Sequence, residues 1–256
     1  MTRKFPEIGR HVFGVAAIVF GVSGLVWGDF AAPWHPVRPT VPYRTALAYI
    51  AAIVFLAGGL AVQWRRTTRA GLIALAVLYG LGALLWMPRV IGFPSLFGVW
   101  NGFAEEFAMV AAVLVAFAAA RTDTAPWSLP VARILFGLCS LSFGIEHFTA
   151  IPQTASMVPA WLPPGQRFWA VATGTAMVLA GLSLISGILA AWAAWGLTTL
   201  MLLFEVVVWI PRVAANPGRQ IPWAGNAITI AVAASACMVA EVLSRRALKV
   251  DAAPVR

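Results

Sequence analysis

The pentapeptide Trp209-Ile210-Pro211-Arg212-Val213 decides how this chain is organised, because it is a second copy. Trp86-Met87-Pro88-Arg89-Val90 differs from it at one residue and lies 123 residues earlier. The same offset aligns further residues: Arg10 with Arg133, Phe13-Gly14 with Phe136-Gly137, Phe20-Gly21 with Phe143-Gly144, Trp100 with Trp223 and Gly102 with Gly225. Self-similarity at a fixed offset indicates one structural unit written twice. We therefore predict a first repeat over residues 1–122 and a second over 123–256.

The composition places both repeats in a lipid bilayer. The chain is 61% hydrophobic and 11% charged, whereas a soluble domain has about 25% charged residues. Its net charge of +9 comes with arginines spaced between apolar runs, and no basic stripe is interleaved with base-stacking aromatic residues. This pattern excludes nucleic-acid binding and favours a multi-pass membrane protein in contact with lipid.

Eight continuous apolar runs predict eight transmembrane helices, four in each repeat. The first run cannot be a cleaved signal peptide, because its copy is internal. Continuous runs, rather than alternating ones, exclude a β-barrel. The expected spans are 12–26, 46–62, 71–87, 103–120, 134–149, 168–185, 189–210 and 227–242. The fold class is thus all-α integral membrane, with two parallel four-helix repeats, or two four-helix bundles in tandem.

The basic residues predict the orientation in the membrane. With the N-terminus inside, the inner segments hold twelve of the 18 lysines and arginines. By the positive-inside rule both termini are then cytoplasmic. Four spans per repeat is an even number, so both repeats have the same orientation, with their pseudo-twofold axis along the membrane normal.

Acidic residues within the spans are the candidate site. Charged groups cost about 2.5–3.5 kcal/mol each at the centre of a membrane helix, so they need an explanation. Glu146 and His147 lie at the outer end of the fifth span, Glu205 in the seventh, and Glu105 and Glu106 in the fourth. Helix rise places all of them in the outer third of the bilayer. The first repeat lacks the counterparts of Glu146, His147 and Glu205.

Two interpretations of these acids remain open. Arg212 lies two turns after Glu205 on an ideal helix, so an ion pair between them would fix the helix register. In the functional interpretation, Glu146, His147 and Glu205 are catalytic and exchange protons with a quinone headgroup or a thiol substrate. The ligand-binding residues would then be Arg212, Arg89, Glu105, Glu106, Trp209 and Trp86.

The repeated Trp-x-Pro-Arg-Val string also has two interpretations. Proline ends the helix, tryptophan anchors it in the interface and arginine reaches lipid phosphates. Alternatively, the tryptophans near the outer ends of the spans line a groove for a quinone or another isoprenoid lipid. We favour the anchoring interpretation, because it explains every residue of the string.

Other cofactor patterns are missing from the sequence. Cys139 and Cys237 are lone residues in separate apolar runs, and neither a CxxC pair nor a zinc pattern is present. His11 is expected at the inner side, while His35 and His147 are expected at the outer side. The sequence therefore predicts no haem, no metal site and no covalently bound cofactor, which leaves a quinone as the candidate ligand.

The second repeat resembles the DoxX family of bacterial membrane proteins. The resemblance rests on Val158-Pro159-Ala160-Trp161-Leu162-Pro163-Pro164, on Arg167-Phe168-Trp169 and on Thr173-Gly174-Thr175-Ala176. It implies four-span units, some of which serve as membrane subunits of thiosulfate:quinone oxidoreductase or accompany thiol-redox proteins. The chain departs from the family in having two units, and in having Thr175 and Ala176 where an acidic residue is expected.

The resulting functional prediction is a membrane subunit or anchor of an inner-membrane redox complex, linked to quinone or thiol chemistry. A redox partner subunit would supply the electrons. The alternative is a small-solute transporter or channel with its site between the repeats. A transporter predicts an aqueous cavity that reaches Glu205, a redox subunit predicts a lipid-open slot lined by tryptophan, and an anchor predicts neither. The sequence does not give the oligomeric state.

Overall fold

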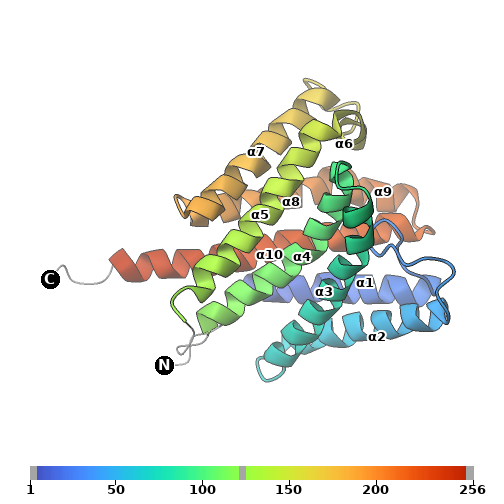
Figure 1. Cartoon of the computed structure of the whole chain (residues 1–256), viewed down its shortest axis with the longest axis horizontal. Helices are drawn as coiled ribbons and strands as arrows, with labels where there is room; N and C mark the ends of the chain where they lie inside the picture. Colours follow the sequence, from blue (N-terminus) through green and yellow to red (C-terminus); the bar gives the residue numbers. More distant parts are fainter. Residues whose placement is uncertain (1–4, 121–124, 252–256) are drawn as a thin grey trace.

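A computed structural model describes residues 5–120 and 125–251 of the chain (Figure 1). Within these residues every regular element is a helix, and eight helical segments are long and apolar enough to cross a membrane. They are α1 (Ile8–Trp27), α2 (Arg44–Gln63), α3 (Thr68–Gly92), α4 (Phe97–Ala120), α5 (Ser128–Thr149), α7 (Gln166–Ser186), α8 (Ala190–Phe204) continued by a π-helical turn η1 (Glu205–Trp209) and α9 (Ile210–Ala215), and α10 (Gln220–Asp251). A short helix, α6 (Ile151–Met157), follows α5.

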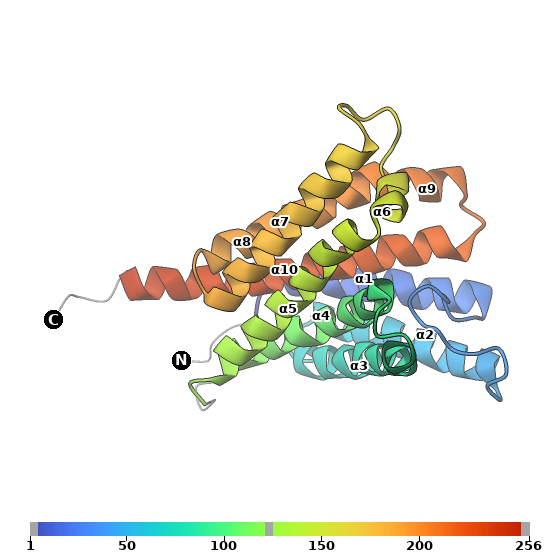
Figure 2. The same ribbon diagram turned by 45° about the horizontal axis from the view of Figure 1, so that its top comes forward.

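The eight expected spans are confirmed, and each helix extends beyond its apolar run. Several helices include Trp, Arg or Gln at an end, and such residues extend a span into the interface. The two ends of the molecule are defined here by the chain. The terminal end is where α1 begins and α10 ends, and the distal end carries the loops 28–43, 93–96, 158–165 and 216–219 together with α6 (Figure 2).

The two repeats pack through each other's terminal helices. α1 packs on α2 and on α10, while its counterpart α5 packs on α7 and on α4. α4 and α10, the last helix of each repeat, also pack together, and α10 is the most buried span. Among the described residues, contact of α1 with α4 and of α5 with α10 is marginal at most. The helices therefore share one core. The predicted boundary at 122/123 lies outside the described residues.

Glycines let the first two helices of each repeat approach backbone to backbone. A Cβ on Gly181 of α7 would lie 2.8 Å from the carbonyl oxygen of Gly137 on α5. In the first repeat a Cβ on Gly14 of α1 would lie 2.7 Å from the carbonyl oxygen of Gly59 on α2. Small residues at a helix crossing maximise van der Waals contact where lipid provides no hydrophobic drive.

Replacement of Gly181 by leucine is expected to destabilise the protein by about 1–3 kcal/mol, because backbone on α5 cannot move aside as a side chain would. Gly196→Leu on α8 is the matched control, since a Cβ there meets no heavy atom within 4 Å. Thermal unfolding in detergent measures the difference. Equal midpoints for the two variants would contradict the close approach of α5 and α7.

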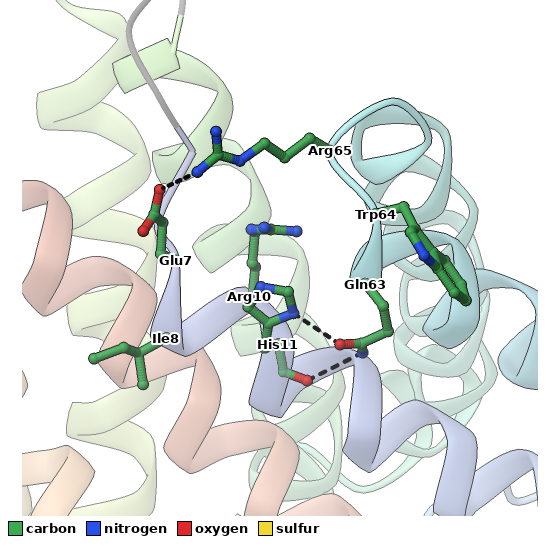
Figure 3. Close-up of a pocket in the computed structure, with 7 residues that line it drawn as sticks. All are labelled: Glu7, Ile8, Arg10, His11, Gln63, Trp64 and Arg65. Atoms are coloured by element: carbon green, nitrogen blue, oxygen red, sulfur yellow. Dashed lines mark hydrogen bonds and ion pairs between the residues drawn. The ribbon is translucent and has the colours of Figure 1, made fainter.

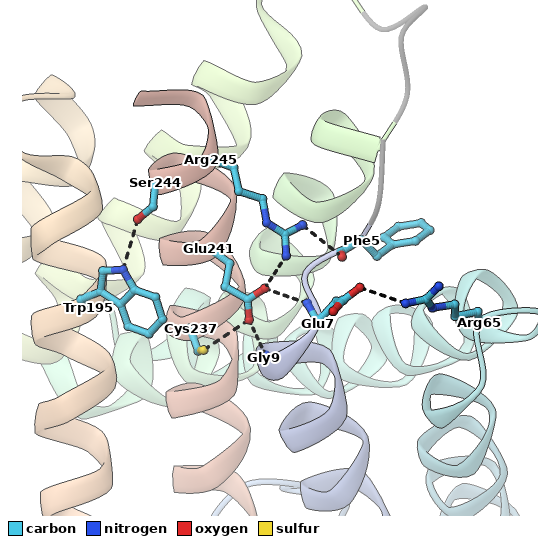
Figure 4. A network of polar contacts seen from close by, with 9 residues as sticks. All are labelled: Phe5, Glu7, Gly9, Arg65, Trp195, Cys237, Glu241, Ser244 and Arg245. Atoms are coloured by element: carbon cyan, nitrogen blue, oxygen red, sulfur yellow. Dashed lines mark hydrogen bonds and ion pairs between the residues drawn. The ribbon is translucent and has the colours of Figure 1, made fainter. Parts of the chain in front are cut away.

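A buried carboxylate joins the repeats at the terminal end (Figure 4). Glu241 of α10 accepts the backbone N–H groups of Glu7 at 2.7 Å and Gly9 at 2.8 Å, and pairs with Arg245 at 3.1 Å. α1 has no capping side chain of its own, and its first N–H groups need acceptors. Pro130, the counterpart of Glu7 in the second repeat, has no N–H to satisfy. Glu241 therefore caps α1 across the repeat boundary.

Candidate functional site

The predicted site residues lie at the distal ends of α3, α4, α5 and η1. Glu146 and His147 are in the last turn of α5, and Glu205 begins η1. The structure places Glu146 of the second repeat beside α4 of the first: its Oε1 would lie 3.4 Å from a Cβ on Gly98. Glu105 lies two turns further along α4. Glu146 therefore lies beside α4, where the two repeats join.

Glu106 faces the other way on α4, into the first repeat. Its side chain is 0% exposed, and its Oε1 lies 3.5 Å from Nε2 of His35. Its Oε2 would lie 2.7 Å from a Cβ on Gly82 of α3. Gly82 is the counterpart of Glu205, so the glycine in the first repeat makes room for a carboxylate that comes from the neighbouring helix instead.

Glu106 lies in a polar cluster whose hydrogen-bonding capacity is not filled. Among the described residues, neither of its oxygens has a hydrogen-bond partner, and the buried hydroxyl of Tyr79 on α3 has none either. Buried polar groups are normally paired. The cluster of Glu106, Tyr79 and His35 is therefore a place where a proton or a water molecule would be bound strongly.

His35 comes from the 28–43 loop, which folds back over the distal ends of α1 and α2. Its ring packs against Phe20, Phe30 and Phe55, with centroid distances of 5.1, 6.1 and 5.9 Å. Burial lowers the pKa of His35 from 6.5 to about 4. The imidazole is thus neutral at pH 7, and its contact with Glu106 is not an ion pair.

The depressed pKa of His35 predicts acid sensitivity. Between pH 6.5 and 4 the unfolded chain protonates this imidazole and the folded protein does not. The contribution of the neutral His35 to the free energy of unfolding is therefore fully present above pH 6.5. It falls by about 3 kcal/mol as the pH drops from 6.5 to 4. His35→Phe removes the group, so its melting temperature is expected to change less between pH 6.5 and 4.5. Parallel curves for the two proteins would contradict a buried neutral imidazole.

A small cavity adjoins His35 on the side away from Glu106. Its volume of about 20 Å³ fits a single water molecule. Its polar lining comes from both repeats and includes Ser23, Asp29 and Gln220, and the Gln220 amide donates to the Asp29 carbonyl at 2.7 Å. This cavity is large enough for one water molecule and too small for a quinone ring.

Glu205 is paired differently from the sequence expectation. The Asn226 side-chain amide on α10 donates to its Oε1, while its Oε2 has no partner among the described residues. The predicted ion pair with Arg212 is wrong: the described residues show none between the two, and Arg212 lies over the Trp209 ring, 5.3 Å from its centroid. The cause is η1, because a π-helical turn adds one residue to the register.

His147 of α5 contacts the end of α8. Its ring stacks on Phe204, the residue before Glu205, at a centroid distance of 6.4 Å. Its Nδ1 donates to the Phe143 carbonyl at 2.9 Å, so Nε2 is the acceptor in the neutral ring. His147 therefore presents an acceptor nitrogen beside Phe204.

The repeated tryptophans pack on the last helix of their own repeat. A side chain at Gly102 would collide with the ring of Trp86, and one at Gly225 with the ring of Trp209. Arg89 lies over Trp86 at 5.1 Å, as Arg212 does over Trp209. These contacts explain why the glycines recur at the same offset. They do not fit an interfacial anchor, because Trp86 and Trp209 are buried and α3 continues through Pro88 to Gly92.

Trp34 connects the two copies of the string. Its carbonyl accepts the Trp86 indole N–H at 2.9 Å, and its ring contacts Trp209 at a centroid distance of 6.0 Å. Sequence reasoning missed Trp34, His35, Tyr79 and Asn226 as members of the site. Only the Trp34-His35 pair in a proline-bounded loop offered a signal, since the other two lie on ordinary apolar helix faces.

The described residues contain no group of three or more His, Cys, Asp or Glu side chains placed to hold a metal ion. Cys139 and Cys237 are buried, free and on different helices. The site is therefore built from carboxylates, imidazoles, a phenol and an amide, which are groups that bind and move protons.

Comparison with known proteins gives one match. The family model of DoxX matches residues 128–209, from the start of α5 to the end of η1. Neither the curated proteins nor the solved structures compared with the chain gave a match. The matched stretch contains Glu146, His147, Glu205 and Trp209, whereas Glu105, Glu106 and α10 lie outside it.

Proposed function

We propose, from the match of the DoxX family model to residues 128–209, that this multi-pass membrane protein is a membrane subunit of a quinone- or thiol-linked redox complex. In this proposal the complex lies in the bacterial inner membrane, with both termini of the chain in the cytoplasm. A partner subunit supplies electrons, and this chain supplies the proton-handling groups at the distal end.

One observation carries the proposal: carboxylates and imidazoles from both repeats gather at the distal end of the spans. Ionisable groups inside a membrane are expensive, and those that are retained mark ligand sites and proton pathways. Here Glu146 lies beside α4 of the first repeat, and His147 stacks on Phe204, the residue before Glu205. A subunit that served only as an anchor would not need so many ionisable groups inside the membrane.

A quinone would reach these groups from the lipid. The Glu205 side chain is 5% exposed, but the next residue, Val206, is 60% exposed and would face lipid. Reduction of a quinone to a quinol consumes two electrons and two protons. In the proposal, the electrons come from the partner. Protonated Glu205 donates one proton to a ring oxygen, and His147 takes up the second proton at Nε2 and passes it to the other ring oxygen; Glu205 is then reprotonated.

Native mass spectrometry of the gently solubilised protein tests this function. A retained quinone together with a redox partner is the expected result. A partner without a small molecule would leave only the anchoring role. A chain without either, whose solute uptake is abolished by Glu205→Gln, would instead make the protein a transporter.

A further inference from the structure

A second polar site lies at the opposite end of the molecule, at the start of α1 and the end of α2. It is a pocket of about 570 Å³ lined by Glu7, Ile8, Arg10, His11, Gln63, Trp64 and Arg65 (Figure 3). The proposed redox function does not use it. We propose that this pocket binds the phosphate of an anionic phospholipid headgroup.

The cationic groups of the pocket are fixed by its own residues. Nη1 of Arg10, which is 5% exposed, donates to the Val62 carbonyl at 2.6 Å and to Thr68 Oγ1 at 3.0 Å. An arginine has five N–H donors. These two hydrogen bonds use only Nη1 of Arg10, so the donors on Nε and Nη2 are left for a ligand. Planar guanidinium groups bind phosphate oxygens in pairs.

The wall beside Arg10 is rigid as well. His11 Nδ1 donates to Gln63 Oε1 at 2.8 Å, and Gln63 Nε2 donates back to the His11 carbonyl at 3.2 Å. Arg65 supplies the second guanidinium, and Figure 3 shows it near that of Arg10. It is held by Glu7 at 3.2 Å in an ion pair whose partners are both exposed. Exposed pairs of this kind are weak, so a phosphate can displace the carboxylate.

The corresponding place in the second repeat is built differently. Arg133 is the counterpart of Arg10 and also reaches a helix-end carbonyl, that of Ile185 at 3.4 Å. There Gly187 follows the end of α7 with a φ of 88°, and the Arg133 guanidinium lies where a side chain of residue 187 would be. In the first repeat Trp64 takes that position in an extended conformation, and Arg10 lines the pocket.

The position along the span identifies the ligand as a lipid. The pocket lies at the first turn of α1 and the last turn of α2, where headgroups meet the hydrocarbon. Ile8 and Trp64 on its lining are 65% and 61% exposed, so they offer apolar contact to the glycerol and acyl chains. Two arginines behind an apolar rim match the chemistry of an anionic phospholipid.

Arg65→Ile tests the site, because isoleucine is the residue at the equivalent position, 188, of the second repeat. Arg65→Ile is expected to weaken binding of phosphatidylglycerol about fivefold to tenfold, since one headgroup contact is lost. Arg66→Ala removes the same charge from an exposed neighbour outside the pocket, and its affinity is expected to stay within about twofold of the original. The affinities are measured by native mass spectrometry of the full chain titrated with phosphatidylglycerol or phosphatidylcholine.

Three further results would each bear on the assignment. Trp64→Gly is expected to weaken the binding of phosphatidylglycerol as well, because the Arg10 guanidinium can then pack against the backbone of residue 64 as that of Arg133 packs against Gly187. Equal affinity for the two lipids, or no loss in Arg65→Ile, would overturn the site. Thermal stabilisation by inorganic phosphate that Arg65→Ile removes, without selective lipid binding, would assign the pocket to a soluble phosphate and overturn the headgroup assignment.

Discussion

Glu205→Gln is expected to lower quinone reduction by the intact complex by about 10²- to 10⁴-fold, which is the contribution of a positioned general acid. The amide keeps the size of the carboxylate and can still hydrogen-bond with Asn226, so the helix contact survives. It cannot deliver a proton. Turnover with a soluble quinone analogue measures the loss, and chain content and melting temperature show whether the variant is folded.

Thr199→Val on α8 is the control for this experiment. Its hydroxyl is exposed and bonds only to its own helix, at the Trp195 carbonyl 3.1 Å away. It lies in the same spanning segment as Glu205, and its activity is expected to match that of the unmodified chain. A folded Glu205→Gln complex with full turnover would remove Glu205 from the proposed proton pathway.

Glu241→Leu is expected to cost about 2–5 kcal/mol of stability, the largest structural effect that we predict for a single residue. The change leaves the N–H groups of Glu7 and Gly9 without the acceptor that they have now. An unsatisfied buried donor costs about 1–3 kcal/mol. Unfolding in mixed micelles measures the loss.

Glu241→Gln separates the two contributions to that loss. An amide oxygen still accepts one backbone N–H, so this variant is expected to lose less than half as much as leucine does. The Arg245 pair disappears in both variants, so it does not contribute to the difference between them. Equal losses in the two variants would show that charge, rather than capping, makes Glu241 important.

The spans were predictable because each is a continuous apolar run with its own length and ends. The position of the acids of α4, α5 and η1 toward the distal end was predictable for the same reason, since height along a helix follows from residue count. Local sequence does not encode which faces meet. The polar neighbours of Glu106 and Glu205 come from a loop and from α10, both far away in the chain.

The register of Arg212 shows the same limit within one helix. An ideal α-helix brings Arg212 two turns beyond Glu205 on one face, and this spacing suggested an ion pair. η1 inserts a wider turn between them, and the apolar residues of that turn carry no sign of it. Only the packing of Trp209 on Gly225 and of Glu205 on Asn226 accounts for the altered register.

The packing of α1 on α10 has a consequence for biosynthesis. α10 is made after every other span, so α1 enters the membrane long before the helix that caps its first turn exists. Until α10 is inserted, the first repeat therefore lacks one of its packing partners, and lipid or a chaperone must cover the face of α1 that α10 later covers. A ribosome that stalls before α10 would release a chain whose earliest helix has no final position.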